Sequence, residues 1–266
     1  MKVGIAGLGT IGTVVARALD AGIDGLSLDA VAARDHDKAR RRMESFRKVA
    51  PVVSAEELAE RVAVVCECVP KAAFREIAEP ALSRGRMLIT VSGAALLDAP
   101  DLLDLARRSG GRILLATGAI LGLDALRAAA EGEIESVTMV TRKPPRSLRG
   151  APYLQDHNIN IDLLDKPLRV FEGSAEEGAQ GFPSNVNVAA AIGLAGVGAA
   201  RTRLEIWADP GAERNMHTVR VEADSARFEM SIENVPSDEN PGTGKLTALS
   251  VIATLRGLVS PLKVGT

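Results

Sequence analysis

The stretch Gly7-Leu8-Gly9-Thr10-Ile11-Gly12 lies close to the start of this 266-residue chain. Residues 2–6 before it predict a short apolar strand, and residues 13–19 after it have the apolar spacing of a helix. A G-x-G-x-x-G motif in this context is typical of the first βα turn of a dinucleotide-binding domain. Its glycines permit a tight turn, close approach of a pyrophosphate and close packing of helix on strand. The alternative is a glycine-rich turn without a ligand. The residues predicted to contact the dinucleotide here are Gly7, Gly9, Thr10, Ile11 and Gly12.

The end of the second predicted strand is where such a domain reads the ribose. Residues 25–33 predict that strand, and Arg34 and Asp35 follow it. An acidic residue at this place suits the ribose hydroxyls of NAD, whereas an arginine suits the 2′-phosphate of NADP through charge-assisted contacts. The alternative is a solvated turn. We expect the chain to use NAD or NADP, with both residues at the cofactor.

Strands alternate with helical segments over the first part of the chain. This alternation favours βαβ units and a parallel sheet with right-handed crossovers. A capping box is expected at Ser54-Ala55-Glu56-Glu57. The further segments predict helices at 37–48, 71–84 and 102–109, and strands at 61–69, 86–91 and 112–116.

Near Leu121 the pattern changes to alternating strands with a tight connection, which is typical of an antiparallel sheet with one covered face. We therefore predict an α/β protein with an N-terminal Rossmann-type parallel-sheet domain and a smaller α+β domain with a mainly antiparallel sheet. The first domain is expected at 1–121, with the helix in 241–266 returning to it, and the substrate and dimerisation domain at 122–240. The segments of the second region are strands at 135–142, 204–208, 216–221 and 227–232, helices at 187–197 and 245–258, and a surface loop at 144–145 and 151–160.

Composition limits the classes of partner. A formal net charge of −2 gives no reason to expect nucleic acid or an anionic membrane as a partner. No apolar run approaches the roughly 20 residues that span a bilayer, and no signal peptide is recognised, so a cytoplasmic location is expected. The two cysteines, Cys66 and Cys68, do not form a C-x-x-C pair, and no metal site is expected.

The chain has three histidines, so the search for a general acid or base is short. His36 lies in a charged turn and His157 in a polar loop, and both are expected at the surface. His217 begins a strand after a polar turn. From the residues alone, a structural or merely exposed role for His217 remains the more common alternative.

Five stretches, which follow one another in a fixed order along the chain, indicate a particular protein family. They are Thr117-Gly118-Ala119-Ile120 with Gly122-Leu123-Asp124-Ala125-Leu126, Thr141-Arg142-Lys143-Pro144, Phe171-Glu172-Gly173-Ser174-Ala175, Asn185-Val186-Asn187-Val188-Ala189-Ala190-Ala191, and Ala208-Asp209-Pro210 with Asn215-Met216-His217. In this order they closely resemble the L-aspartate dehydrogenases. One departure is notable: where that family usually reads Asn-Pro-Lys-Thr-Ser, this chain has Asn240-Pro241-Gly242-Thr243-Gly244-Lys245.

The resemblance implies a homodimer that oxidises L-aspartate with NAD or NADP. Iminoaspartate would form, and water would convert it to oxaloacetate and ammonia unless it were withdrawn toward NAD biosynthesis. The resemblance also implies that His217 is catalytic and that Ala119 and Asn187 contact the cofactor. Because histidine has an unperturbed pKa of about 6.5, it suits a proton shuttle near neutrality. We hypothesise that His217 takes a proton from the substrate amine or from the water that attacks the imine.

A dicarboxylate substrate needs cationic contacts in a protein of nearly neutral charge. Arg142 and Lys143 at a strand end are candidates, and Lys245 is a third because it could substitute for the missing family residues. The alternative for the first two is a solvated pair. Two other functions stay open: a reductase of the same architecture, such as a dihydrodipicolinate reductase, and a non-catalytic nicotinamide-binding redox regulator. The chain lacks the His-His-x-x-Lys stretch of the former.

Overall fold

The structure is a computed structural model that describes residues 1–183, 186–240 and 242–265. Asn185 and Pro241, which belong to stretches quoted above, lie outside the described residues. The chain divides into two compact units. The first comprises Met1–Gly118 and Thr247–Lys263, and the second comprises Ala119–Leu246 and Val264–Thr266.

The first unit is built on a parallel sheet of six strands in the order β3-β2-β1-β4-β5-β6. This is the strand order of a doubly wound dinucleotide-binding domain, whose ligands lie beyond the carboxyl ends of the strands. Central strand β1 pairs with two neighbours, Ile5 lying opposite Val31 on one side and Cys66 on the other. The predicted Rossmann-type fold is confirmed. Its strands are β1 (Lys2–Ala6), β2 (Ser27–Ala32), β3 (Val52–Val53), β4 (Val64–Glu67), β5 (Met87–Thr90) and β6 (Arg112–Leu115).

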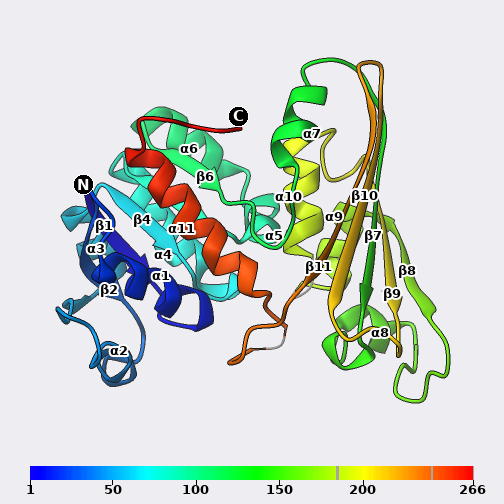
Figure 1. Cartoon of the computed structure of the whole chain (residues 1–266), viewed down its shortest axis with the longest axis horizontal. Helices are drawn as coiled ribbons and strands as arrows, with labels where there is room; N and C mark the ends of the chain where they lie inside the picture. The colour runs from blue at the N-terminus through cyan, green and yellow to red at the C-terminus, as the bar shows by residue number, and fades with distance from the viewer. Residues whose placement is uncertain (184–185, 241, 266) are drawn as a thin grey trace. The chain divides into compact units, whose positions relative to one another are not determined.

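Helices cover both faces of this sheet, which is why its strands are nearly continuous apolar runs (Figure 1). One core joins β1 to Leu19 of α1 and to Val251 and Leu255 of α11. The other core joins the opposite face to Phe74 and Ile77 of α4. The helices are α1 (Thr10–Ala21), α2 (His36–Arg42), α3 (Ala55–Arg61), η1 (Lys71–Ala73), α4 (Phe74–Ser83), α5 (Gly93–Leu97), α6 (Asp101–Ser109) and α11 (Lys245–Val259).

One local prediction in this unit is wrong, and two short elements were missed. The helix expected at 37–48 ends at Arg42, because the chain turns at Met43 to bury Met43 and Phe46 in the core. Strand β3 and helix α5 were not anticipated, since each is too short to show a period. At the expected capping box, the Ser54 hydroxyl accepts a hydrogen bond from the Glu57 N–H at 3.1 Å.

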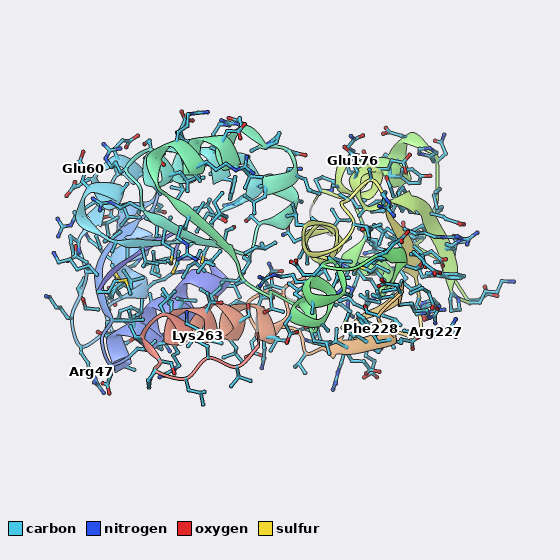
Figure 2. All side chains as sticks on the ribbon, turned by 90° about the horizontal axis from the view of Figure 1, so that it is seen from above. Arg47, Glu60, Glu176, Arg227, Phe228 and Lys263 are labelled. Atoms are coloured by element: carbon cyan, nitrogen blue, oxygen red, sulfur yellow. The ribbon has the colours of Figure 1, made fainter. Side chains whose placement is uncertain are left out.

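The second unit contains a five-stranded sheet in the order β11-β10-β7-β9-β8. Three of its four pairings are antiparallel and one, β7 with β9, is parallel, so the sheet is mainly antiparallel as predicted. Strands β10 and β11 form the predicted hairpin, with Arg227 and Phe228 near its turn (Figure 2). The strands are β7 (Ile134–Lys143), β8 (Leu168–Ser174), β9 (Thr202–Ala208), β10 (Asn215–Ala223) and β11 (Arg227–Asn234).

Helices α7, α9 and α10 lie on one face of this sheet (Figure 1). Helix α10 is rich in small residues, and a Cβ on Gly193 would lie 2.7 Å from the Cα of Ala199. The small residue therefore lets α10 pack closely against the segment that follows it. The helices of the unit are α7 (Leu123–Ala129), η2 (Pro145–Ser147), α8 (Pro152–Asp156), α9 (Ala175–Gly181) and α10 (Asn187–Ala195).

The surface loop predicted at 144–145 and 151–160 is wrong. Pro145 and Pro152 begin the short helices η2 and α8, since proline is tolerated at the first helical position. Leu154 is buried, and Tyr153 packs edge-on against Phe171 of β8. Strand β8 itself was also missed.

Candidate functional site

The glycine-rich turn of the first unit has room for a phosphate. Gly7 has a φ of 86°, and a Cβ on it would lie 2.7 Å from the Cys68 carbonyl oxygen. A Cβ on Gly12 would lie 1.8 Å from the Gly7 carbonyl oxygen, so this position of α1 admits no side chain. A Cβ on Gly9 would meet no described heavy atom within 4 Å. The space beside the Gly9 backbone is therefore open, whereas the space beside Gly7 and Gly12 is filled by neighbouring atoms. Thr10 and Ile11 follow Gly9 as the first residues of α1. This cradle fits an anionic phosphate.

The end of β2 offers one exposed cation and one partly engaged carboxylate. Arg34 and Asp35 are both exposed. The Asp35 side chain accepts a hydrogen bond from the Lys38 N–H at 2.9 Å and so caps α2. Sequence reasoning had assigned Asp35 to the ribose and had missed this capping role.

A second arginine lies beside the glycine-rich turn. Arg42 Nη1 donates a hydrogen bond to the Thr13 hydroxyl at 2.9 Å, and that hydroxyl donates to the Leu8 carbonyl oxygen at 3.1 Å. No local pattern links residues that lie 29 positions apart, so this contact could not be predicted from the sequence.

A buried carboxylate ties together the ends of β4 and β5. Glu67 is almost fully buried, and its Oε1 accepts a hydrogen bond from the Val69 N–H at 2.8 Å. Its Oε2 accepts from the Thr90 hydroxyl at 2.6 Å, and the Thr90 oxygen accepts from the Ser92 N–H at 2.9 Å. Burial raises the pKa of Glu67, although these hydrogen bonds oppose the shift. Sequence reasoning missed this residue because it sits within an apolar strand.

In the second unit, polar side chains gather on the buried face of the sheet. Thr141 and Lys143 alternate with half-buried positions at the end of β7, and His217 lies on the neighbouring strand β10, directly opposite Thr141. His217 Nδ1 lies 3.1 Å from the Thr141 hydroxyl. His217 is 3% exposed and Lys143 is 5% exposed. Buried polar groups of this kind are uncommon in a sheet core unless they serve a site.

Burial controls the charge of both groups. It lowers the pKa of His217 to about 3, and the nearby Lys143 cation lowers it further in the same direction. Burial also lowers the pKa of Lys143 to about 8. His217 is therefore a neutral imidazole near pH 7, which corrects the expectation of an unperturbed value near neutrality. Lys143 is a cation that can lose its proton in mildly alkaline solution.

The structure does not bring the three predicted substrate cations together. Arg142 points to the opposite face of β7 from Lys143, where its guanidinium lies 4.8 Å from the Trp207 ring centroid and 3.6 Å from Asp209. Lys245 is exposed and pairs with Asp238 at 3.0 Å. Of the three, Lys143 alone lies on the buried face with His217.

Of the remaining predicted residues, Ala119, Asn187 and His157 lie in the second unit and His36 lies in the first. The Ala119 carbonyl oxygen accepts a hydrogen bond from Asn234 Nδ2 at 2.9 Å. Asn187 is the exposed first residue of α10. His36 and His157 are exposed, as predicted.

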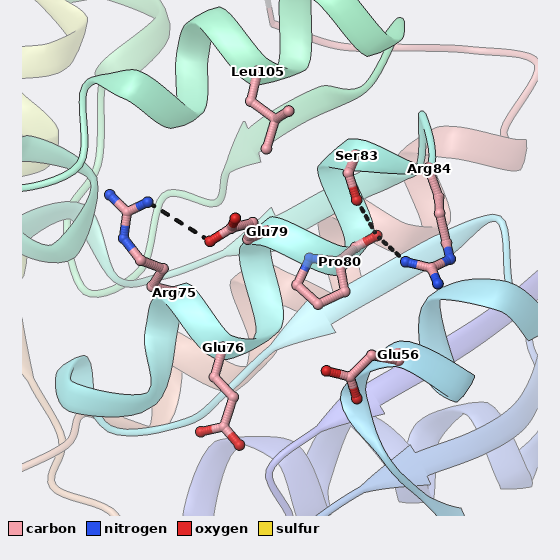
Figure 3. A pocket seen from close by; sticks show the side chains of 8 residues that line it. All are labelled: Glu56, Arg75, Glu76, Glu79, Pro80, Ser83, Arg84 and Leu105. Atoms are coloured by element: carbon pink, nitrogen blue, oxygen red, sulfur yellow. Dashed lines mark hydrogen bonds and ion pairs between the residues drawn. The ribbon is translucent and has the colours of Figure 1, made fainter.

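Away from the strand ends, a shallow groove of about 400 Å³ runs along α4 (Figure 3). Ion pairing occupies part of it, since Arg75 lies 3.8 Å from Glu79, and Ser83 and Arg84 both bond to the Pro80 carbonyl oxygen. No histidine or buried cation lines it. We do not assign it to the reaction.

Two family profiles match the chain in succession. Residues 7–116 match the profile described as homoserine dehydrogenase, NAD binding domain, and residues 124–258 match that described as aspartate dehydrogenase, C-terminal. The L-aspartate dehydrogenase of Bradyrhizobium diazoefficiens is 54% identical over 266 residues, covering 100% of this chain and 94% of the relative. The chain belongs to the aspartate dehydrogenase family.

Other members of the aspartate dehydrogenase family agree over the full length. L-aspartate dehydrogenase 3 of Bordetella bronchiseptica is 48% identical, covering 100% of this chain and 98% of its own. The crystal structure of aspartate dehydrogenase from Thermotoga maritima superposes with a TM-score of 0.76 at 28% identity, covering 100% and 99% of the two chains. The NAD-binding profile and these relatives support an oxidoreductase with an NAD(P) cofactor.

Part of the family resemblance has a structural explanation. Ser174, in the stretch 171–175, forms a reciprocal capping box with Glu177 at the start of α9. The Asp209 N–H donates to the Lys143 carbonyl oxygen at 2.9 Å, which fixes the end of β7. Among the described residues, no cluster of three or more His, Cys, Asp or Glu side chains could hold a metal ion, and no helix has the length and apolarity to cross a membrane.

Proposed function

We propose that the chain oxidises L-aspartate with NAD or NADP to iminoaspartate, which water converts to oxaloacetate and ammonia. Family membership and the names of the full-length relatives support this substrate. The observation that carries the chemistry is the buried set of Thr141, Lys143 and His217 on one face of the sheet. The buried cation suits the carboxylates of the substrate, and the neutral imidazole can accept a proton during the reaction.

When bound, the nicotinamide cofactor supplies the acceptor for the hydride that leaves the substrate Cα. Gly7, Gly9 and Gly12 would hold its pyrophosphate, with Thr10 and Ile11 offering N–H groups. We also retain Ala119 and Asn187 as proposed cofactor contacts, because the family resemblance assigns them. The open backbone at Gly9 supports the fit.

Lys143 is proposed to bind a carboxylate of the substrate. Its pKa is lowered because burial leaves the ammonium poorly solvated. A carboxylate beside it would favour the charged form, so substrate and proton would bind together. Arg142 and Lys245 lie away from this buried face, and we assign them no part in the reaction.

His217 is proposed to manage a proton during the reaction. Its Nδ1 faces Thr141, which leaves Nε2 for a substrate or water molecule. A neutral imidazole is ready to accept a proton from the water that attacks the imine. Two substrate carboxylates nearby would raise the pKa of His217 and strengthen it as a base.

The cofactor preference is proposed to depend on Arg34. Its exposed guanidinium follows β2, where a 2′-phosphate would be read. Arg34→Ala should raise the KM for NADP by about 10- to 100-fold, the loss of one charge-assisted contact, with little effect on the KM for NAD. An unchanged KM for NADP would show that the contact is absent.

We also propose a homodimer in the cytoplasm, as the family resemblance implies. The sheet face opposite α9 and α10 carries half-buried Val140, Trp207 and Met216, which offers a surface for a second copy. Light scattering on purified protein measures the mass directly. A monomer at micromolar concentration would contradict the dimer.

One assay tests the proposed reaction. NADH or NADPH formation is followed on adding L-aspartate, with D-aspartate, L-glutamate and L-homoserine as controls. Turnover with L-aspartate alone is expected. Cofactor binding without turnover of any amino acid would favour a redox regulator instead.

A further inference from the structure

Two buried amide oxygens on the same sheet face have no hydrogen-bond partner in the part of the chain that the structure describes. Asn215 is 8% exposed and Asn234 is 4% exposed. The Oδ1 atom of each makes no hydrogen bond among the described residues. Leaving a buried acceptor unpaired is costly, so such atoms in a folded protein call for an explanation.

The two side chains are neighbours by register. Asn215 on β10 lies directly opposite Asn234 on β11. Asn215 is also two residues from His217 on the same strand, and residues two apart point to the same face. The two acceptors therefore lie on the face that carries His217 and Lys143.

Hydrogen bonding fixes which way Asn234 is turned. Its Nδ2 donates to the Ala119 carbonyl oxygen, which can only accept, so Oδ1 must point away from that partner. Gly244 lies against this oxygen, and a Cβ there would be 3.0 Å from it. The glycine keeps a protein side chain from covering the acceptor.

The polar groups on this face of the sheet indicate which kind of molecule binds there. Amide oxygens accept N–H donors, whereas the Lys143 cation attracts a carboxylate. A molecule with both an amino group and a carboxylate meets both demands. We propose that Oδ1 of Asn215 and Oδ1 of Asn234 accept hydrogen bonds from the amino group of the substrate, an inference that rests on the proposed oxidation of L-aspartate.

Neutral amides suit this reaction better than carboxylates would. Oxidation at Cα requires the ammonium group to lose a proton first, and a nearby carboxylate would stabilise the ammonium form. An amide oxygen accepts an N–H from the ammonium, the amine and the protonated imine alike. The pair thus holds the nitrogen at each stage without opposing its deprotonation.

Asn215 is the better position for a test, because Asn234 also anchors Ala119. Asn215→Leu removes the acceptor at similar size. The KM for L-aspartate should rise about 10- to 100-fold, as expected for a lost hydrogen bond to a charged group. The inhibition constant of succinate, which has the carboxylates but no amino group, should change by less than about twofold. Thr218→Val, on the same strand but the opposite face, is the matched control.

A second variant guards against misfolding and needs no inhibitor. Asn215→Asp keeps an acceptor for the amino group and adds a negative charge at that acceptor. Its kcat should fall and its pH optimum should rise, because the carboxylate holds the ammonium in its charged form. Thermal melting and NADH binding verify that both variants are folded.

The outcomes separate the two proposals. A parent enzyme that does not oxidise L-aspartate overturns the proposed function and this inference with it. If the parent is active, Asn215→Leu changing the L-aspartate and succinate constants by the same factor, or changing neither, overturns the inference alone. An Asn215→Asp variant with parental kcat and pH profile overturns it as well.

Discussion

At the scale of single residues, adjacent side chains of β7 take opposite roles. Lys143 is buried beside His217, whereas Arg142 stacks over Trp207 on the other face. The two look equivalent in the sequence, and a shift of one residue decides which faces the core. The charge state of each buried group then follows from its surroundings rather than from its residue type.

His217 is the residue on which the proposed reaction depends most. His217→Ala should lower kcat about 10²- to 10⁴-fold, the usual contribution of general acid–base catalysis. His36→Ala is the matched control, because His36 is exposed at the start of α2. Steady-state kinetics with L-aspartate measures both. A kcat and kcat/KM of His217→Ala within about twofold of the parent would exclude the proposed role.

Lys143 should couple substrate binding to proton uptake. Its pKa in the free protein is about 8, and a bound carboxylate raises it. Above about pH 8, succinate should therefore bind together with a proton, and its affinity should weaken as the pH rises further. Calorimetry in two buffers of different ionisation enthalpy measures the uptake. Lys143→Met should abolish it, whereas Lys245→Met should retain it. Equal proton uptake by the parent and Lys143→Met would refute the assignment.

Much of the residue-level site was visible in the sequence. The glycine-rich turn is a local motif, and its strand and helix neighbours are local patterns too. Asn234 and Glu67 were not visible, because their significance arises from partners 115 and 23 residues away. Neither the amide oxygen of Asn234 nor the buried carboxylate of Glu67 can be recognised from the residues next to it in the sequence.

At the scale of elements, segments with a clear apolar pattern were predicted well and segments without one were not. Strand β1 has the predicted bounds, and α11 differs from its prediction by one residue at its end. Strand β8 was missed because its two buried apolar residues, Val170 and Phe171, are adjacent rather than alternating, at a register shift in its pairing with β9. Helix α8 was missed because its single proline and its polar residues are also typical of a loop.

The buried Glu67 carboxyl, which is hydrogen-bonded between β4 and β5, should make the free energy of unfolding depend on pH. Burial raises the folded-state pKa of Glu67 above its unfolded value. The folded state then binds more protons between these two values, so the parent loses stability as the pH rises through that window. Glu67→Gln cannot titrate and should show less loss. Urea unfolding at about pH 5 and about pH 8 measures the difference. An identical pH dependence in the parent and Glu67→Gln would contradict this explanation.

At the scale of the whole molecule, the first unit is discontinuous in sequence. Helix α11 completes its core with Val251 and Leu255, after the chain has formed the second unit. Sequence analysis predicted that a C-terminal helix returns to the first domain, because the Asn240-Pro241-Gly242 break separates an apolar helical segment from the strands. The sequence could not specify which of its side chains fill the core, since the pattern of α11 is weakly amphipathic.

The returning helix should therefore control the stability of the dinucleotide-binding unit. Leu255 is fully buried, so Leu255→Ala should cost about 2–5 kcal/mol, whereas Leu249→Ala at an exposed position of the same helix should cost less than about 0.5 kcal/mol. The chain has one tryptophan, Trp207, which lies in the second unit and reports on it by fluorescence. Binding of NADH reports on the folding of the first unit. Two denaturant midpoints are therefore compared, one for the loss of NADH binding and one for the change in Trp207 fluorescence. Leu255→Ala should lower the first midpoint more than the second, because the cavity lies in the first unit. Similar stabilities for Leu255→Ala and Leu249→Ala would contradict a core role for α11.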